Sequence, residues 1–169
     1  SHRHNLGKTG EVRYFQAAET LQLGDLQIET VPTPHDATDG VAFILDDGRK
    51  RLGIFTDLGH VFPGLGKAIS TLDALLLESN YDPHMLLNGP YPYYLQQRIS
   101  GAGGHISNFE AAELLRSAAN PKLQWACLGH LSQENNEPEL ALRTNREILG
   151  PRFPLRMASR YAATPVMEV

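Results

Sequence analysis

The sequence predicts a mixed α/β (α+β) domain. Short apolar runs separated by turn residues fill the first third of the chain, which is typical of strands joined by hairpins. Further along, apolar runs of five or six residues alternate with segments of helical periodicity, which is typical of strand–helix–strand units. The 169 residues are enough for one domain with a sizeable core, and we expect residues 1–169 to form a single, partial domain.

The composition excludes several protein classes. Hydrophobic residues make up 41% of the chain and charged residues 20%, and no apolar run approaches the roughly 18 residues of a membrane span. The net charge of -4 argues against a protein whose whole surface binds polyanions. The single cysteine, Cys127, cannot form an internal disulfide and lies in the apolar run LQWACLG, where a buried hydrophobic residue is expected. A cytoplasmic location is compatible with these features and is our expectation.

The predicted elements follow from apolar runs and turn signals. Residues 1–10 are polar and are expected to be frayed. Strands are predicted over residues 12–16, 21–23, 26–31, 41–45, 52–55, 73–77 and 123–128. Helices are predicted over residues 65–70, 92–99, 108–119 and 138–149, the third of which opens with the capping box Ser107-Asn108-Phe109-Glu110.

Metal-binding residue types follow the predicted strands. Asp57, Glu78 and His130 each come at the end of an apolar run, and two loops add His35 and His105. Imidazole and carboxylate groups gathered at one sheet edge suit a transition-metal site. Each residue also has a structural reading: an Asp at a turn, a Glu that caps a helix, or a histidine that belongs to the core.

The arrangement of these residues resembles the metallo-β-lactamase superfamily. His35 in PHDATDG and Asp57 in TDLG lie 22 residues apart across one hairpin. The segments LLLESNYDPHMLLNGPYP, QQRISGAGGHISN and CLGHLSQENNEPELA are similar to the YycJ/WalJ-type branch, in the same order. The resemblance implies an αββα sandwich. It also implies that His35 and His130 ligate metal and that Asp57 bridges two ions, Zn or Mn.

The resemblance also implies catalytic roles. Glu78 and His105 would lie beside the scissile phosphate, with His105 as proton donor or phosphate clamp and Glu78 orienting it. Asn108 and Asn136, near helix starts, would contact the substrate. The implied activity is that of a metal-dependent phosphodiesterase, a single-strand DNA exonuclease that uses a hydroxide activated by two metal ions.

One departure limits the resemblance. The HxHxDH signature of the superfamily does not occur in the sequence, and Asn5-Leu6-Gly7 follows the HxH of residues 2–4. We expect His2 and His4 to be structural or part of a tag, and the chain to correspond to the C-terminal two-thirds of the superfamily domain. It would then offer an incomplete dinuclear site.

Alternatives therefore stay open. One is a hydrolase of the same superfamily that acts on a small ester, lactone or thioester; another is a catalytically silent fragment that needs the missing segment. Residues 141–163 hold five arginines against one acid, which indicates either a nucleic-acid-binding patch or a solvated helix face.

Overall fold

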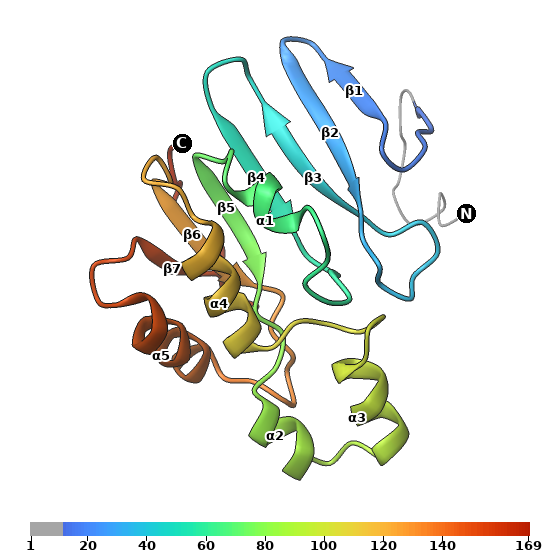
Figure 1. The fold of residues 1–169 in the computed structure, drawn as a ribbon, viewed down its shortest axis with the longest axis vertical. Helices are drawn as coiled ribbons and strands as arrows, with labels where there is room; N and C mark the ends of the chain where they lie inside the picture. The colour runs from blue at the N-terminus through green and yellow to red at the C-terminus, as the bar shows by residue number, and fades with distance from the viewer. Residues whose placement is uncertain (1–11) are drawn as a thin grey trace.

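The computed structural model describes residues 12–169, whose strands form one seven-stranded sheet in chain order (Figure 1). The first four strands pair antiparallel, and the fourth to the seventh run parallel. The mixed α/β prediction is therefore confirmed. The strands are β1 (Thr20–Leu23), β2 (Leu26–Pro32), β3 (Val41–Asp46), β4 (Arg51–Phe55), β5 (Ala74–Glu78), β6 (Trp125–Gly129) and β7 (Leu155–Met157).

Helices cover one face of this sheet. In Figure 1, α1, α4 and α5 lie over the parallel strands, whereas α2 and α3 lie beyond the end of β5. Leu77 of β5 and Leu128 of β6 share one buried cluster with Leu115 of α4. Within residues 12–169, no helix is both long and apolar enough to cross a membrane. The helices are α1 (Leu65–Ile69), α2 (Pro83–Asn88), α3 (Tyr93–Ser100), α4 (Asn108–Ala118) and α5 (Pro138–Leu149).

A second, smaller apolar cluster contains the side chains of β5 and β6 that alternate with those of the main core. Trp125 and Cys127 are buried there, and Met167 and Val169 of the C-terminal segment pack against them. The Trp125 indole N–H donates to the Glu168 carbonyl, 2.8 Å away. Burial raises the pKa of the Cys127 thiol, which confirms the prediction of a buried cysteine that acts as a hydrophobic residue.

Three parts of the sequence interpretation differ from the structure. The strand predicted over residues 12–16 is wrong, because that segment enters a turn in which the Glu19 N–H donates to the Gln16 carbonyl. The sequence interpretation does not include helix α2, although Asp82 caps this helix by accepting from the Met85 N–H and Pro83 occupies its first turn. Strand β7 was not predicted either. The expectation for residues 1–10 lies outside the described residues.

The predicted capping box at the start of α4 is confirmed. Ser107 Oγ accepts from the Glu110 N–H, and the Glu110 carboxylate accepts from the Ser107 N–H. Both interactions satisfy backbone donors that a helix start otherwise leaves unpaired. The box fixes the point at which the chain leaves the loop containing His105 and enters the helix.

Removal of this cap should destabilise the protein. We expect Ser107→Ala to lower the free energy of unfolding by about 1 kcal/mol, because the Glu110 N–H loses its acceptor. Urea denaturation followed by circular dichroism measures the change. Ser117→Ala is the matched control: the Ser117 hydroxyl donates to the Leu114 carbonyl within the same helix and caps nothing. Equal losses in the two variants would contradict the capping role.

Candidate metal centre

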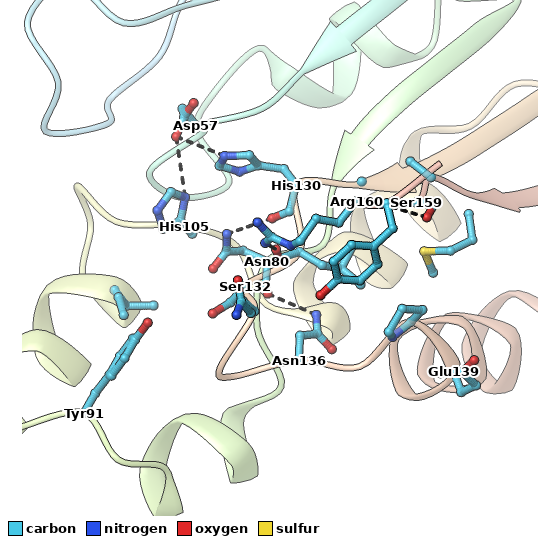
Figure 2. A pocket seen from close by; sticks show the side chains of 18 of the residues that line it. Asp57, Asn80, Tyr91, His105, His130, Ser132, Asn136, Glu139, Ser159 and Arg160 are labelled. Carbon is cyan, nitrogen blue, oxygen red and sulfur yellow. Dashed lines mark hydrogen bonds and ion pairs between the residues drawn. The ribbon is translucent and has the colours of Figure 1, made fainter. Parts of the chain in front are cut away.

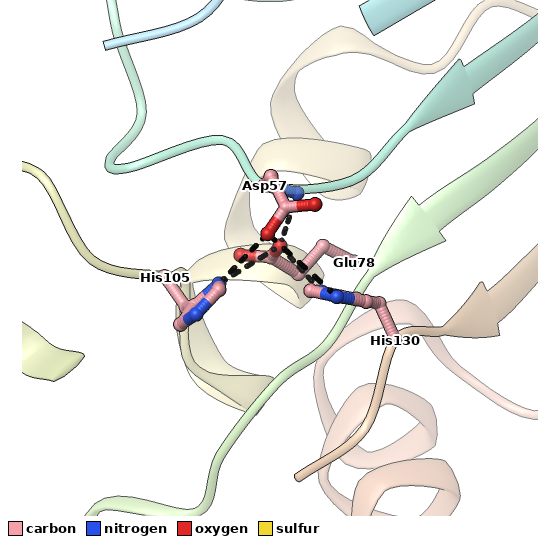
Figure 3. Close-up of side chains that lie close together, drawn as sticks. All are labelled: Asp57, Glu78, His105 and His130. Carbon is pink, nitrogen blue, oxygen red and sulfur yellow. Dashed lines mark hydrogen bonds and ion pairs between the residues drawn. The ribbon is translucent and has the colours of Figure 1, made fainter. Parts of the chain in front are cut away.

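Three parallel strands deliver their end residues to one edge of the sheet. Phe55 of β4 pairs with Leu77 of β5, and Leu77 pairs with Leu128 of β6. Asp57, Glu78 and His130 follow these paired positions within two residues and therefore lie together (Figure 3). Asp57 and His130 both adopt a positive φ, of 53° and 55°, a conformation that non-glycine residues adopt rarely and that often marks functional positions.

Glu78 is the buried centre of the group. Its side chain has no exposed surface, and its Oε2 accepts from the Asp57 N–H at 2.6 Å. Oε1 accepts from the Ile106 N–H at 2.8 Å, and Oε2 also lies 3.3 Å from His105 Nδ1 and 3.0 Å from His130 Nδ1. Burial alone would raise the pKa of Glu78, but these donors outweigh it and lower the pKa to about 2. Glu78 is therefore ionised.

Three imidazoles surround the second carboxylate, Asp57. Asp57 Oδ1 lies 3.5 Å from His35 Nε2, 3.9 Å from His105 Nδ1 and 3.7 Å from His130 Nε2. The five residues singled out in the sequence therefore lie together. One potential ligand atom from each of four residues falls within 4.8 Å of the others; the four are Asp57, Glu78, His105 and His130.

Hydrogen bonding distinguishes the roles of these groups. Because the Glu78 oxygens already accept four donors, Glu78 is suited to orienting histidines rather than to binding a cation. With its Nδ1 proton directed at Glu78, a neutral His130 presents the lone pair of Nε2 toward Asp57 Oδ1. Two acceptors that face each other require a cation or a proton between them. The hydrogen bond to Glu78 correspondingly raises the pKa of His130.

His35 is held differently. Its Nδ1 accepts from the Ala37 N–H at 3.1 Å, so the neutral ring carries its proton on Nε2 and directs it at Asp57. Coordination of a metal through Nε2 would move that proton to Nδ1. Asp36 Oδ1, 3.6 Å from Nδ1, is the nearby acceptor for it.

The sequence interpretation missed the residue that anchors this loop. Arg98 of α3 donates from Nε and Nη2 to the two oxygens of Asp36, at 2.6 and 3.0 Å, and lowers the pKa of that carboxyl group. The Asp36 N–H also donates to the Gly103 carbonyl. Asp36 follows the candidate ligand His35 directly and could have been singled out, but nothing in the sequence links it to an arginine 62 residues away.

The two candidate substrate-binding asparagines form a buried pair. Asn108 Nδ2 donates to Asn136 Oδ1, and Asn136 Nδ2 donates back to Asn108 Oδ1, both at 2.9 Å. Asn136 also donates to the Ser79 and Asn80 carbonyls, and Asn80 Nδ2 donates to the His130 carbonyl. Asn108 is completely buried, so its influence on a substrate would be indirect, whereas Asn136 lines the cavity beside the cluster.

That cavity has a volume of about 970 Å³ and opens beside the histidines (Figure 2). His35, Asp57, His105 and His130 line one end of it. Tyr91 and α3 line another side, and the segment around Arg160 closes a third. The volume lies at the upper end of the range for small-molecule sites and is large enough for a nucleotide.

Comparisons with known proteins agree with this geometry. No protein-family model matches the sequence. The exodeoxyribonuclease WalJ of Streptococcus pneumoniae is 33% identical over 175 residues, which cover 97% of this chain and 64% of WalJ. The exodeoxyribonuclease YycJ of Bacillus anthracis is 30% identical over 135 residues, which cover 80% of this chain and 51% of YycJ. The chain is therefore similar in sequence to two proteins that are named exodeoxyribonucleases.

A solved structure supports the same fold. YhfI of Bacillus subtilis, a metallo-β-lactamase fold protein, aligns with a TM-score of 0.61 at 17% identity. The alignment covers 85% of this chain and 50% of YhfI. The chain thus spans about half of YhfI and no more than 64% of the two curated relatives. The predicted resemblance is confirmed, and the described residues hold part of the superfamily fold.

Loss of the buried carboxylate should weaken metal binding. Glu78→Gln removes the negative charge that both histidines face and places an amide NH₂ opposite either the Ile106 N–H or the three donors to Oε2, so at least one of the four donors loses its acceptor. We expect affinity for Zn²⁺ to fall about 10- to 100-fold, as measured by competition with a chromophoric chelator. Glu113→Gln, on the outer side of α4, should bind as tightly as the wild type. Unchanged affinity in a folded Glu78→Gln variant would show that the histidines do not depend on Glu78.

Gly59 should be required for close packing of the site loops. It has a φ of +74°, and an added Cβ would lie 2.8 Å from the Ala102 carbonyl and 2.9 Å from the His35 nitrogen. Gly48, with a φ of +82°, has nothing within 4 Å of the same position. We expect Gly48→Ala to cost about 1–2 kcal/mol from its backbone conformation alone. Gly59→Ala should cost more and should also weaken metal binding, as measured by urea denaturation and chelator competition. Equal losses of stability and unchanged metal affinity in both variants would contradict the close approach of Gly59 to the loops of Ala102 and His35.

Proposed function

We propose that the protein is a metal-dependent phosphodiester hydrolase that degrades single-stranded DNA from an end. The observation that carries this proposal is the convergence of three imidazoles on Asp57 above the buried Glu78. The two curated relatives are named exodeoxyribonucleases, which supports this substrate class over small esters, lactones or thioesters.

The donor set fits a divalent ion. His35, Asp57 and His130 would supply two imidazoles and a carboxylate, a set that suits Zn or Mn, and three protein ligands leave positions open for water and substrate. Asp57 lies beside all three histidines, so it is the residue that would also be available to a second ion. Bound ions would polarise the phosphodiester and lower the pKa of water.

His105 is suited to the role of general acid. Its Nδ1 lies 3.3 Å from Glu78 Oε2, so Glu78 orients the ring and leaves Nε2 for the substrate. Its side chain is 20% exposed and lines the cavity, where Nε2 could donate a proton to the departing oxygen or bind a phosphate oxygen. Asn136 lines the cavity and would contact the substrate. Its hydrogen bonds with the buried Asn108 would hold its side chain in position.

Substitution of His105 should separate catalysis from metal binding. We expect His105→Ala to retain its metal but to lose turnover by about 10²- to 10⁴-fold, because the leaving oxygen loses its proton donor. Degradation of end-labelled single-stranded DNA on gels and elemental analysis of the protein measure the two effects. His84→Ala, on the exposed side of α2, is the control and should behave as the wild type. Loss of metal from His105→Ala would make this histidine a ligand instead.

The same elemental analysis tests the number of ions. The ligands above predict one tightly bound ion per chain, and a second equivalent would support the dinuclear centre. A protein that binds metal but leaves single-stranded DNA intact while it hydrolyses lactones or thioesters would overturn the nuclease proposal.

A further inference from the structure

The five arginines of residues 141–163 occupy different parts of the molecule. Arg143 and Arg146 lie on α5 beside a separate shallow groove that also contains Glu139 and Glu147. Among these five arginines, only Arg160 lines the cavity that holds the histidine cluster. The predicted basic patch is therefore divided, and one of its members faces the candidate active site.

Arg160 brings a positive charge to the cavity, and no acidic residue in the described part of the chain pairs with it. Its Nη2 donates to the Leu131 carbonyl at 2.8 Å, and among the described residues no carboxylate forms an ion pair with it. In Figure 2 its side chain extends toward Asn80 and His130. The other cation of the cavity wall, Arg98, is occupied by both oxygens of Asp36.

Aromatic side chains accompany this charge. Tyr161, directly after Arg160, lines the cavity and is 87% exposed, so its ring is free to contact a ligand. Tyr91 lines the cavity on the side of α3 (Figure 2). A cationic group beside exposed aromatic rings is the usual combination for single-stranded nucleic acid, where arginine binds the backbone and rings stack on bases.

We propose that Arg160 and Tyr161 form a strand-binding site next to the metal centre. Arg160 binds a phosphate of the single strand beside the one that is cleaved, and Tyr161 stacks on a neighbouring base. This inference rests on the proposed nuclease function, since it names the residues that hold its substrate. The hydrogen bond to Leu131, which follows His130, places the guanidinium at a fixed distance from the cluster.

Binding of a labelled ten-nucleotide oligo-dT, measured by fluorescence anisotropy in EDTA to prevent turnover, tests this site. We expect Arg160→Gln to weaken binding about tenfold and to reduce the slope of log affinity against log salt by about 0.7, the value for one phosphate contact on a single strand. Glutamine removes the charge and keeps a polar side chain, but it ends two bonds short of the Arg160 atom that donates to Leu131. Arg160→Lys should restore most of the affinity.

Two further variants serve as controls. Arg152→Gln removes the same charge from an exposed position outside the cavity and should bind as the wild type does. Tyr161→Ala should weaken binding about tenfold with an unchanged salt slope. Tyr161→Phe keeps the ring and should bind as the wild type does. Thermal unfolding of each variant verifies the fold.

The outcomes separate this inference from the proposed function. A wild-type protein that degrades DNA while Arg160→Gln binds as Arg152→Gln does would overturn the strand-binding site alone. A wild-type protein that binds the oligonucleotide through Arg160 but does not degrade it with Zn²⁺ or Mn²⁺ would overturn the nuclease activity alone.

Discussion

The candidate site depends on one buried carboxylate. A carboxylate removed from water is costly unless several donors replace its hydration, and Glu78 has two backbone N–H groups and two imidazoles in that role. Those donors come from the loop after β4, the loop before α4 and the end of β6. Because each must reach the same two oxygens, Glu78 fixes three separate segments relative to one another.

Contacts with the backbone of the 101–104 loop also hold the loops of the site together. The His60 ring lies 2.7 Å from the Ala102 carbonyl, and the Asp36 N–H donates to the Gly103 carbonyl. The glycine-rich loop before His105 therefore contacts both the loop that carries His35 and the loop that carries Asp57. Arg98 then ties the His35 loop to α3 through Asp36. Three histidines can approach one carboxylate oxygen because the chain around them contains little side-chain bulk.

The sequence predicts those parts of the fold and site whose position follows from a local pattern of apolar and turn residues. Apolar runs located β4, β5 and β6, and the parallel pairing of such strands places Asp57, Glu78 and His130 at one edge. Pattern could not reveal contacts set by packing between distant segments. The Asp36–Arg98 pair spans 62 residues, and the turn at 16–19 replaces an apparently regular strand. Asn108 directly follows the capping residue Ser107, which the sequence predicts. Its buried amide, however, is positioned by hydrogen bonds to the distant residues Ser79 and Asn136.

Environment assigns different tasks to the two carboxylates. Glu78 is inaccessible to solvent and fully occupied by donors, so it holds histidines in one orientation and one tautomer. Asp57 is 46% exposed and faces three imidazole nitrogens across gaps of 3.5 to 3.9 Å, which are longer than hydrogen bonds of normal length. Such spacing leaves the lone pairs of Asp57 and His130 uncompensated by each other. A cation would satisfy both, and the open cavity is a route by which it and the proposed phosphodiester substrate would enter.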